Sequence, residues 1–206
     1  DKNFEEEERI RQLLINKPAK FGNDDPKVDG RVREYLTFVA ETVQEFDDAR
    51  GGKYSFCNLS QTVNISHGEV TGATPDGRKA HEPFSDNSSP VMGRDTSGPT
   101  ATVKSVGAIN QTAFHDGALF NLRFDPKGIE GEKGLEIVEG VIKTYFDNGG
   151  EHIQINVVDN QTLIDAQKNP EKYRGLMVRV AGYMAYFTEL DKAAQDTIID
   201  RTAHLS

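Results

Sequence analysis

Two stretches of alternating polar and apolar residues flank one stretch with helical spacing, and this order constrains the fold most. The alternating stretches are Phe120–Phe124 and His152–Val157, and a period of two predicts strands with two different faces. The apolar residues at helical spacing between them are Leu135, Val138, Val141, Ile142 and Tyr145. A strand–helix–strand order predicts strands joined by a crossover helix, and therefore an α/β architecture.

The periodicity divides the chain into a helical segment, a middle segment of strands and helices, and a terminal unit: residues 1–50, 51–160 and 161–206. The first is predicted to be helical because apolar residues recur at steps of three and four: Val32, Leu36, Val39, Val43 and Phe46. In the middle segment Thr62–Ser66 alternates and is predicted to be a third strand.

Two further stretches have a distinctive composition. Residues 72–99 are rich in Gly, Pro, Asp and Ser, which predicts a long ordered loop that is functional or packed by its own contacts. The terminal unit has a short predicted helix from Leu163 to Lys168 and a second one that runs to about Arg201. Asp191 is the expected N-cap of the second helix.

Composition excludes several classes of protein. The net charge of −9 argues against a nucleic-acid surface, and no apolar run approaches membrane-spanning length. One cysteine, Cys57, excludes an internal disulfide and is typical of the reducing cytoplasm. The histidines lack the spacing of a zinc site, so no metal site is predicted. The start at Asp1, without Met, is interpreted as a fragment, a processed product or one piece of a larger enzyme.

Gly182 lies in an unusual setting for a glycine. It stands in Arg179-Val180-Ala181-Gly182-Tyr183, with Ala185-Tyr186-Phe187 close behind. Glycine in such an apolar and aromatic setting gives up side-chain packing and adds chain entropy that folding must overcome. Taken alone, Gly182 is interpreted as a structural glycine that needs a positive φ or a close backbone approach.

This stretch closely resembles the glycyl-radical loop near the C-terminus of glycyl radical enzymes. The other motifs that resemble the C-terminal part of this family follow in the same order: Ala73-Thr74-Pro75-Asp76-Gly77-Arg78-Lys79-Ala80, Ser89-Pro90, Gly98-Pro99-Thr100-Ala101, Asp116-Gly117 and Gln154-Ile155-Asn156-Val157-Val158. The resemblance implies the closing portion of a ten-stranded α/β barrel. Residues 51–160 would then form part of the active-site wall, and 161–206 the glycyl radical domain.

The resemblance implies that Gly182 stores the radical of an oxygen-sensitive lyase of anaerobic metabolism. A separate activating enzyme, with S-adenosylmethionine and an iron–sulfur cluster, would install the radical, and no dissociable cofactor would be needed during turnover. Gly182 would pass the radical to a cysteine in a Gly-Cys-Val-Glu-like run. This chain has no such run, so the thiol is expected on a segment or subunit not in this chain. Small accessory subunits are further expected partners.

Several residues have both a structural and a functional interpretation. Cys57 lacks the surroundings of the family's catalytic cysteine and is interpreted as an inert core thiol. Arg179 is either an ordinary ion-pair partner or, with Tyr183, a support of the radical loop. Gln154 and Asn156 share one strand face, which we expect to face the barrel lumen, where they can hydrogen-bond the loop or the substrate.

Val63 and Ile65 are interpreted as neighbours on one strand face. They are core residues by default, and in a barrel they can form the apolar wall of the substrate pocket. A hydrocarbon, which offers no hydrogen-bonding group, would suit such a wall.

The substrate prediction depends on local departures from the common family pattern. Phe84-Ser85-Asp86-Asn87, the aromatic run Phe120–Phe124 and Met184 look most like the branch of benzylsuccinate and alkylsuccinate synthases. That branch adds hydrocarbons to fumarate. The alternatives are a glycyl radical dehydratase, an arylacetate decarboxylase, or an exchangeable subunit that repairs oxygen-damaged enzymes. A repair subunit needs little beyond residues 145–206, so the longer likeness favours an enzyme.

Overall fold

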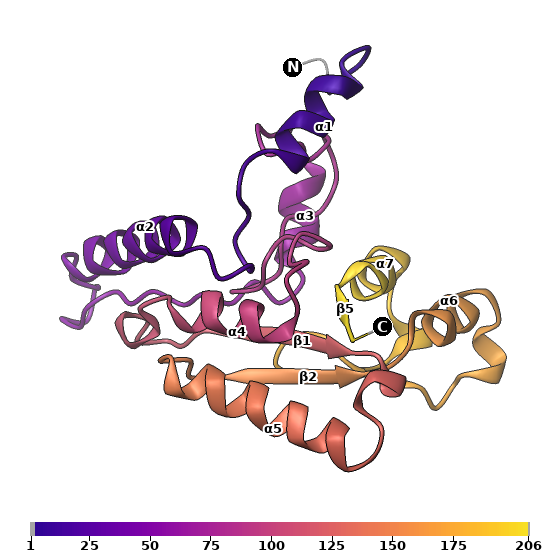
Figure 1. The fold of residues 1–206 in the computed structure, drawn as a ribbon. Helices are drawn as coiled ribbons and strands as arrows, with labels where there is room; N and C mark the ends of the chain where they lie inside the picture. Colours follow the sequence, from indigo (N-terminus) through magenta and orange to yellow (C-terminus); the bar gives the residue numbers. More distant parts are fainter. Residues whose placement is uncertain (1–2, 206) are drawn as a thin grey trace.

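The computed structural model describes residues 3–205, and its centre is a parallel three-stranded sheet (Figure 1). Its strand order is β2–β1–β5, with β1 at Phe120–Phe124, β2 at Ile153–Val157 and β5 at Ala203–His204. The helix α5, Gly131–Asp147, connects β1 to β2. The predicted strand–helix–strand order is therefore confirmed, and its two strands pair in parallel.

The remaining elements surround this sheet. The other α-helices are α1 Glu8–Asn16, α2 Pro26–Gln44, α3 Val63–Glu69, α4 Pro99–Gly107, α6 Asn160–Lys168 and α7 Lys192–Asp200. Short 3-10 turns occupy Gln111–Ala113, Pro126–Ile129, Pro170–Lys172 and Phe187–Glu189. A separate antiparallel hairpin pairs β3, Met177–Arg179, with β4, Met184–Tyr186. Within residues 3–205 no helix is long and apolar enough to cross a membrane.

The first apolar core lies between the sheet and the helices α4 and α5. Every second residue of β1 points into it, and α2 packs against it through partly buried side chains: Phe120, Leu122 and Phe124 from β1, and Val32 and Leu36 from α2. The helix α2 begins at Pro26 because Asp25 accepts hydrogen bonds from the backbone N–H groups of Lys27 and Val28.

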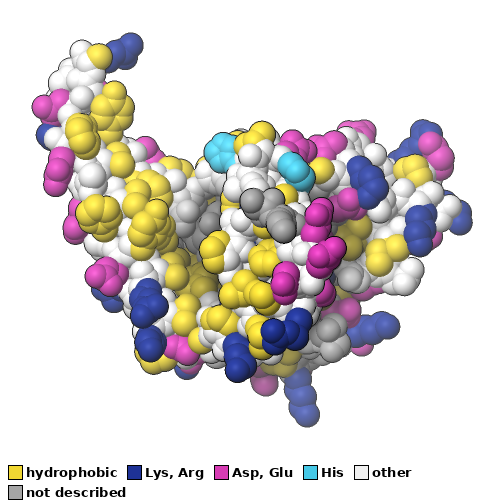
Figure 2. All heavy atoms as spheres, turned by 90° about the horizontal axis from the view of Figure 1, so that it is seen from above, with side chains coloured by type: hydrophobic (Ala, Val, Ile, Leu, Met, Phe, Trp, Pro, Cys, Tyr) yellow, Lys and Arg dark blue, Asp and Glu magenta, His cyan; other side chains and the backbone are white. Residues whose placement is uncertain are grey.

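The second half of α2 exposes apolar surface. Tyr35 and Phe38 are exposed, and the helix ends at Gln44, so Phe46 lies beyond it and does not extend the predicted stripe into the core. Figure 2 shows exposed hydrophobic side chains over the part of the molecule where Figure 1 places α2.

A second apolar core belongs to the last part of the chain. It joins α6, the hairpin and α7 through buried side chains: Val158, Leu163, Ala166, Val178, Val180, Phe187 and Ile198. The two predicted helices of this region are present, and Asp191 caps α7 by accepting a hydrogen bond from the N–H of Ala194. β5, which follows α7, pairs with β1 and so anchors the end of the described chain to the central sheet.

The predicted strand over Thr62–Ser66 is wrong, because the chain forms the helix α3 there. A five-residue alternation is too short to exclude a helix. The inward face of α3 carries Asn64 and Gly68, four residues apart, and both are buried. Asn64 donates a hydrogen bond to the carbonyl of Phe84, and a Cβ at Gly68 would lie 2.3 Å from the carbonyl oxygen of Glu82. A polar residue and a glycine make this buried face, so apolar periodicity did not reveal it.

Between Val70 and Gly98 the chain forms no helix or strand, as predicted for an ordered loop. Arg78 organises this loop from a buried position. Its guanidinium donates to the carbonyls of Thr71, Gly72 and Glu82 and lies 4.3 Å from the centre of the Phe84 ring. The loop is therefore packed by its own contacts.

Candidate active site around the Gly182 hairpin

Gly182 occupies the tip of the β3–β4 hairpin. The N–H of Val180 donates to the carbonyl of Tyr183 at 3.0 Å, which leaves Ala181 and Gly182 as the turn between them. Gly182 has φ +81°, a conformation that residues with a Cβ rarely adopt. A Cβ there would meet only Leu119 Cδ1, at 3.7 Å. The backbone conformation alone therefore favours glycine, whereas the space around it would accept a methyl group.

A buried polar face of the sheet lies behind the hairpin. The register of the parallel pair places Asn121 opposite Gln154 and Arg123 opposite Asn156. All four side chains are buried, on the face opposite the first apolar core. The alternation predicted for both strands is therefore confirmed, and one of their two faces is polar.

Asn156 binds the backbone of the hairpin directly. Its Nδ2 donates to the carbonyl of Arg179 at 2.9 Å, and its Oδ1 accepts from the N–H of Arg179 at 2.8 Å. The structure shows neither of the two roles predicted for the Arg179 side chain, because the hydrogen bonds of this residue in the described chain are made by its backbone. Its guanidinium makes no hydrogen bond or ion pair within residues 3–205.

Two residues that the sequence did not single out hold the next carbonyl. Val180 O accepts from Arg201 Nη2 at 2.7 Å and from Asn121 Nδ2 at 3.2 Å. The same Nη2 forms an ion pair with Asp86 Oδ2 at 2.7 Å, and that carboxylate oxygen also accepts from Asn121 at 2.8 Å. Arg201 directly follows α7 and Asp86 lies in the 72–98 loop, so no local pattern could have paired them.

Gln154 and Tyr183 differ in their surroundings. Gln154 is 5% exposed, and neither atom of its amide has a hydrogen-bond partner within the described residues. Tyr183 is exposed, and its backbone carbonyl closes the turn. Tyr183 therefore belongs to the turn itself and Gln154 to the sheet behind it, and their support of a radical loop stays a prediction.

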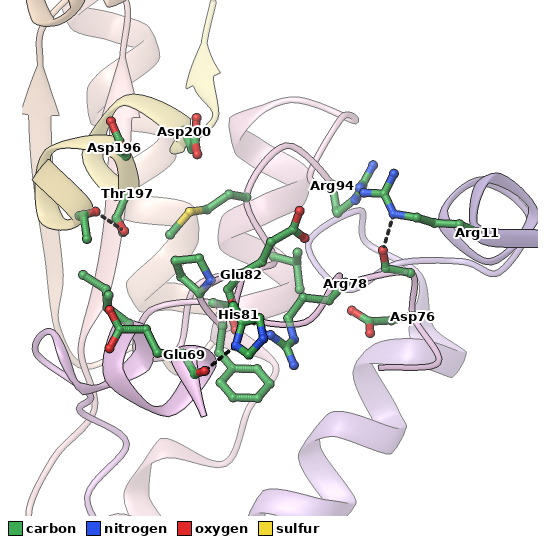
Figure 3. Close-up of a pocket in the computed structure, with 18 residues that line it drawn as sticks. Arg11, Glu69, Asp76, Arg78, His81, Glu82, Arg94, Asp196, Thr197 and Asp200 are labelled. Atoms are coloured by element: carbon green, nitrogen blue, oxygen red, sulfur yellow. Dashed lines mark hydrogen bonds between the residues drawn. The ribbon is translucent and has the colours of Figure 1, made fainter. Parts of the chain in front are cut away.

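Val63 and Ile65 do not share a face, because they lie two residues apart on a helix rather than on a strand. Val63 is 45% exposed. Ile65 lines an open pocket of about 570 Å³ between α3, the loop and α7 (Figure 3). This pocket has many charged residues, among them Asp196 and Asp200 of α7. The prediction that Val63 and Ile65 share one apolar strand face is therefore wrong. Any substrate contact of either residue stays a prediction.

The pKa values of two further side chains, Cys57 and Asp200, are raised above their ordinary values. Burial raises the pKa of the half-buried Cys57 thiol, and the charge of Asp116 adds to the shift, so the thiolate is disfavoured. Burial likewise raises the pKa of Asp200, helped by neighbouring Asp196. Within residues 3–205 no three His, Cys, Asp or Glu side chains cluster in a way that could hold a metal ion.

Comparisons with known proteins identify the family. Residues 84–188, which contain the hairpin and most of the residues that bind it, match the family model described as Glycine radical. Residues 1–68 match the model described as Pyruvate formate lyase-like. This chain belongs to the glycyl radical enzyme family. It carries the glycyl-radical portion of such an enzyme, and its mixed helix and sheet structure agrees with the predicted α/β barrel class.

The individual relatives include dehydratases, isethionate sulfite-lyases and an indoleacetate decarboxylase. A probable dehydratase of Escherichia coli is 43% identical across 96% of this chain and 25% of its own length. The trans-4-hydroxy-L-proline dehydratase of Clostridioides difficile is 42% identical across 98% of this chain and 26% of its own length. The solved structure of the B12-independent glycerol dehydratase from Clostridium butyricum aligns with a TM-score of 0.94 and 44% identity over 99% of this chain and 26% of that one.

These relatives bear on the substrate predicted from the sequence. The chain spans about a quarter of their length. The radical-bearing role predicted for this chain holds, and the glycyl radical is a property of the family. The dehydratase and decarboxylase alternatives are better supported than the addition of a hydrocarbon to fumarate, because the matched proteins include dehydratases and an indoleacetate decarboxylase.

Proposed function

We propose that Gly182 carries the radical of a glycyl radical dehydratase, a lyase that acts on a small hydroxylated compound. The observation that carries this proposal is the identity of 42–44% to dehydratases over 96–99% of the chain, which exceeds the identity of 37–40% to the sulfite-lyases and decarboxylases. The hairpin tip supports it, because the tip presents a glycine with space around its Cα. A radical on that carbon can become planar without a steric clash.

In the proposed reaction the radical on Gly182 takes a hydrogen atom from a cysteine of the complete enzyme, and the thiyl takes one from a substrate carbon. The substrate radical loses hydroxide from the neighbouring carbon and one of its own protons, which together leave as water. The product radical then regains its hydrogen atom from the thiol. The cysteine lies on a segment outside this chain in this proposal, and a separate activating enzyme with S-adenosylmethionine and an iron–sulfur cluster installs the radical.

The buried polar face of β1 and β2 supports a hydroxylated substrate. Asn121 and Asn156 bind the hairpin, whereas the amide of Gln154 is buried with no hydrogen-bond partner in the described chain. A buried amide gains most from a ligand that can hydrogen-bond to it. A hydroxyl group can do so and a hydrocarbon cannot. We therefore assign Gln154 to substrate orientation rather than to the apolar wall of a hydrocarbon pocket.

A substrate panel tests this function in the complete enzyme after anaerobic activation. We expect product from one of glycerol, 1,2-propanediol or trans-4-hydroxyproline, and none from toluene with fumarate or from arylacetates. Growth on glycine deuterated at Cα should collapse the splitting of the radical resonance, which reports the formation of a glycyl radical independently of the substrate. Turnover of toluene with fumarate, and of no hydroxylated compound, would reject the dehydratase assignment while leaving the radical in place.

A further inference from the structure

The hairpin meets the central sheet along a seam of polar groups rather than along an apolar surface. We define the polar seam by the side chains on its sheet side and the groups on its hairpin side: Asp86, Asn121 and Asn156 against Arg201 and the backbone of Arg179 and Val180. Its four hydrogen-bonding side chains are buried. The two apolar cores of the chain lie on either side of this seam and do not share residues.

Arg201 belongs to the hairpin side of the polar seam. Its Nη1 donates to Arg179 O at 3.1 Å and its Nη2 to Val180 O at 2.7 Å, so one guanidinium holds two successive carbonyls. The hairpin and α7 are also joined through the second apolar core, which includes Val178 and Ile198. The chain joins β5, which stays paired with β1, only after Arg201, so Arg201 can move together with the hairpin.

Asp86 belongs to the sheet side. It is 2% exposed, and its Oδ2 accepts from Arg201 at 2.7 Å and from Asn121 of β1 at 2.8 Å. Arg201 is 7% exposed. This ion pair is the one contact across the seam that joins two opposite full charges, and it links residues 115 positions apart. Its geometry holds the base of the hairpin in one position relative to β1.

The chemistry of the polar seam favours reversible separation. When a buried ion pair separates into water, rehydration of the two charges offsets much of the lost attraction. Removing one partner has a different effect, because the other charge stays buried and unpaired as long as the seam is closed. Such a substitution therefore destabilises the closed state specifically and leaves the open, hydrated state nearly unchanged.

We propose that Asp86 and Arg201 form a latch that keeps the Gly182 hairpin docked during turnover and releases it for activation. Both are positioning residues, since they act on Gly182 through the carbonyls of Arg179 and Val180. A radical loop must be held in place for hydrogen transfer, yet an activating enzyme must reach it. The latch reconciles the two demands, because it is geometrically specific when closed and separates at low net free energy. This inference rests on the radical role proposed for Gly182.

The test compares the complete enzyme with its Asp86→Asn variant. Three readouts are measured: amide hydrogen exchange over residues 177–186 before activation, the initial rate at which the activating enzyme generates radical spins, and turnover per spin. We expect the variant to exchange these amides at least tenfold faster and to accumulate spins several-fold faster. Turnover per spin should fall at least tenfold, because the hairpin is docked for less of the time. Faster activation with slower turnover is a split that a merely structural role would not produce.

Two further variants make the test decisive. Arg201→Lys keeps the charge but loses the fork that holds two carbonyls, so it should show the same split if Asp86→Asn does not fold. Lys192→Gln breaks an exposed ion pair with Asp196 on the same helix and should change none of the three readouts. Activation that slows together with turnover, or unchanged exchange over 177–186, would overturn the latch. Absence of radical in the unmodified enzyme would instead reject the proposed function, whereas the exchange readout would still judge the latch.

Discussion

The side-chain amide of Asn156 pairs with both backbone groups of Arg179, donating to its carbonyl at 2.9 Å and accepting from its N–H at 2.8 Å. This one side-chain amide thus hydrogen-bonds both backbone groups of a β3 residue, as a neighbouring strand would. The contact places the base of the Gly182 hairpin against β2. It also explains why a polar residue occupies a buried position of that strand, because its polar atoms are satisfied there.

Replacing Asn156 by Ala should release the base of the hairpin. The substitution leaves the N–H of Arg179 without a partner and its carbonyl with Arg201 alone, at a cost of about 1–3 kcal/mol. We expect the Arg179 amide to exchange hydrogen faster while the amides of β1 remain protected. Asn148→Ala is the matched control, since Asn148 donates only to Thr144 O on the exposed side of α5. Equal exchange in both variants would contradict the role of Asn156.

Gly182→Ala separates the conformational role of this glycine from its chemical role. The added Cβ has room, but φ +81° makes the turn strained, by about 1–2 kcal/mol. We expect a folded protein that shows no organic-radical resonance after activation. Gly175→Ala is the control, because a Cβ there meets nothing within 4 Å, and its radical signal should equal that of the unmodified protein. A persisting signal in the Gly182 variant would exclude this residue as the radical site.

Cys57→Ser should keep most of the activity of the complete enzyme. The thiol is half-buried and lacks the Gly-Cys-Val-Glu-like surroundings of the family's catalytic cysteine, so we expect it to pack in the core rather than to react. We expect unchanged spin yield and at least half of the turnover per spin. Loss of turnover with fold and radical retained would show that Cys57 is the hydrogen-abstracting thiol and that no partner segment supplies it.

Because Tyr145 is buried, we expect the folded protein to lose stability at high pH. The Tyr145 side chain is fully buried, its hydroxyl bonds Gln111 and the carbonyl of His152, and burial raises its pKa to about 12. Below the unfolded-state pKa of about 10 both states are protonated and this group causes no pH dependence. Between about pH 10 and 12 only the unfolded state ionises, so the free energy of unfolding should fall by about 3 kcal/mol.

Urea unfolding at pH 9, 10 and 11 measures this effect. Tyr145→Phe keeps the ring in the first apolar core but removes the titrating group, so the variant should show a smaller fall over the same range. It should also be less stable at pH 7 by about 1 kcal/mol, because Gln111 loses a buried partner. Identical pH dependence in the two proteins would mean that other groups cause the alkaline loss.

Local patterns predicted the elements that have one apolar face and a clear period. Alternation identified β1 and β2, helical spacing identified α5, and Asp191 marked the start of α7. The same reasoning failed at α3, where Asn64 and Gly68 make the buried face. That face depends on the 82–84 backbone packed against it, which no window of neighbouring residues contains.

The candidate site likewise contains residues that the sequence predicted and residues that it did not. The motif around Gly182 and the polar residues of β2 could be read from the sequence, because the spacing of a few neighbouring residues carries that information. Asp86 and Arg201 could not, because they are 115 positions apart and become partners only when the loop and the end of α7 meet against β1. The sequence by itself determined the family, the strand–helix–strand core and the radical glycine as a candidate. Only the tertiary structure decided which side chains hold that glycine in place, since a buried ion pair is formed by long-range packing and not by local preference.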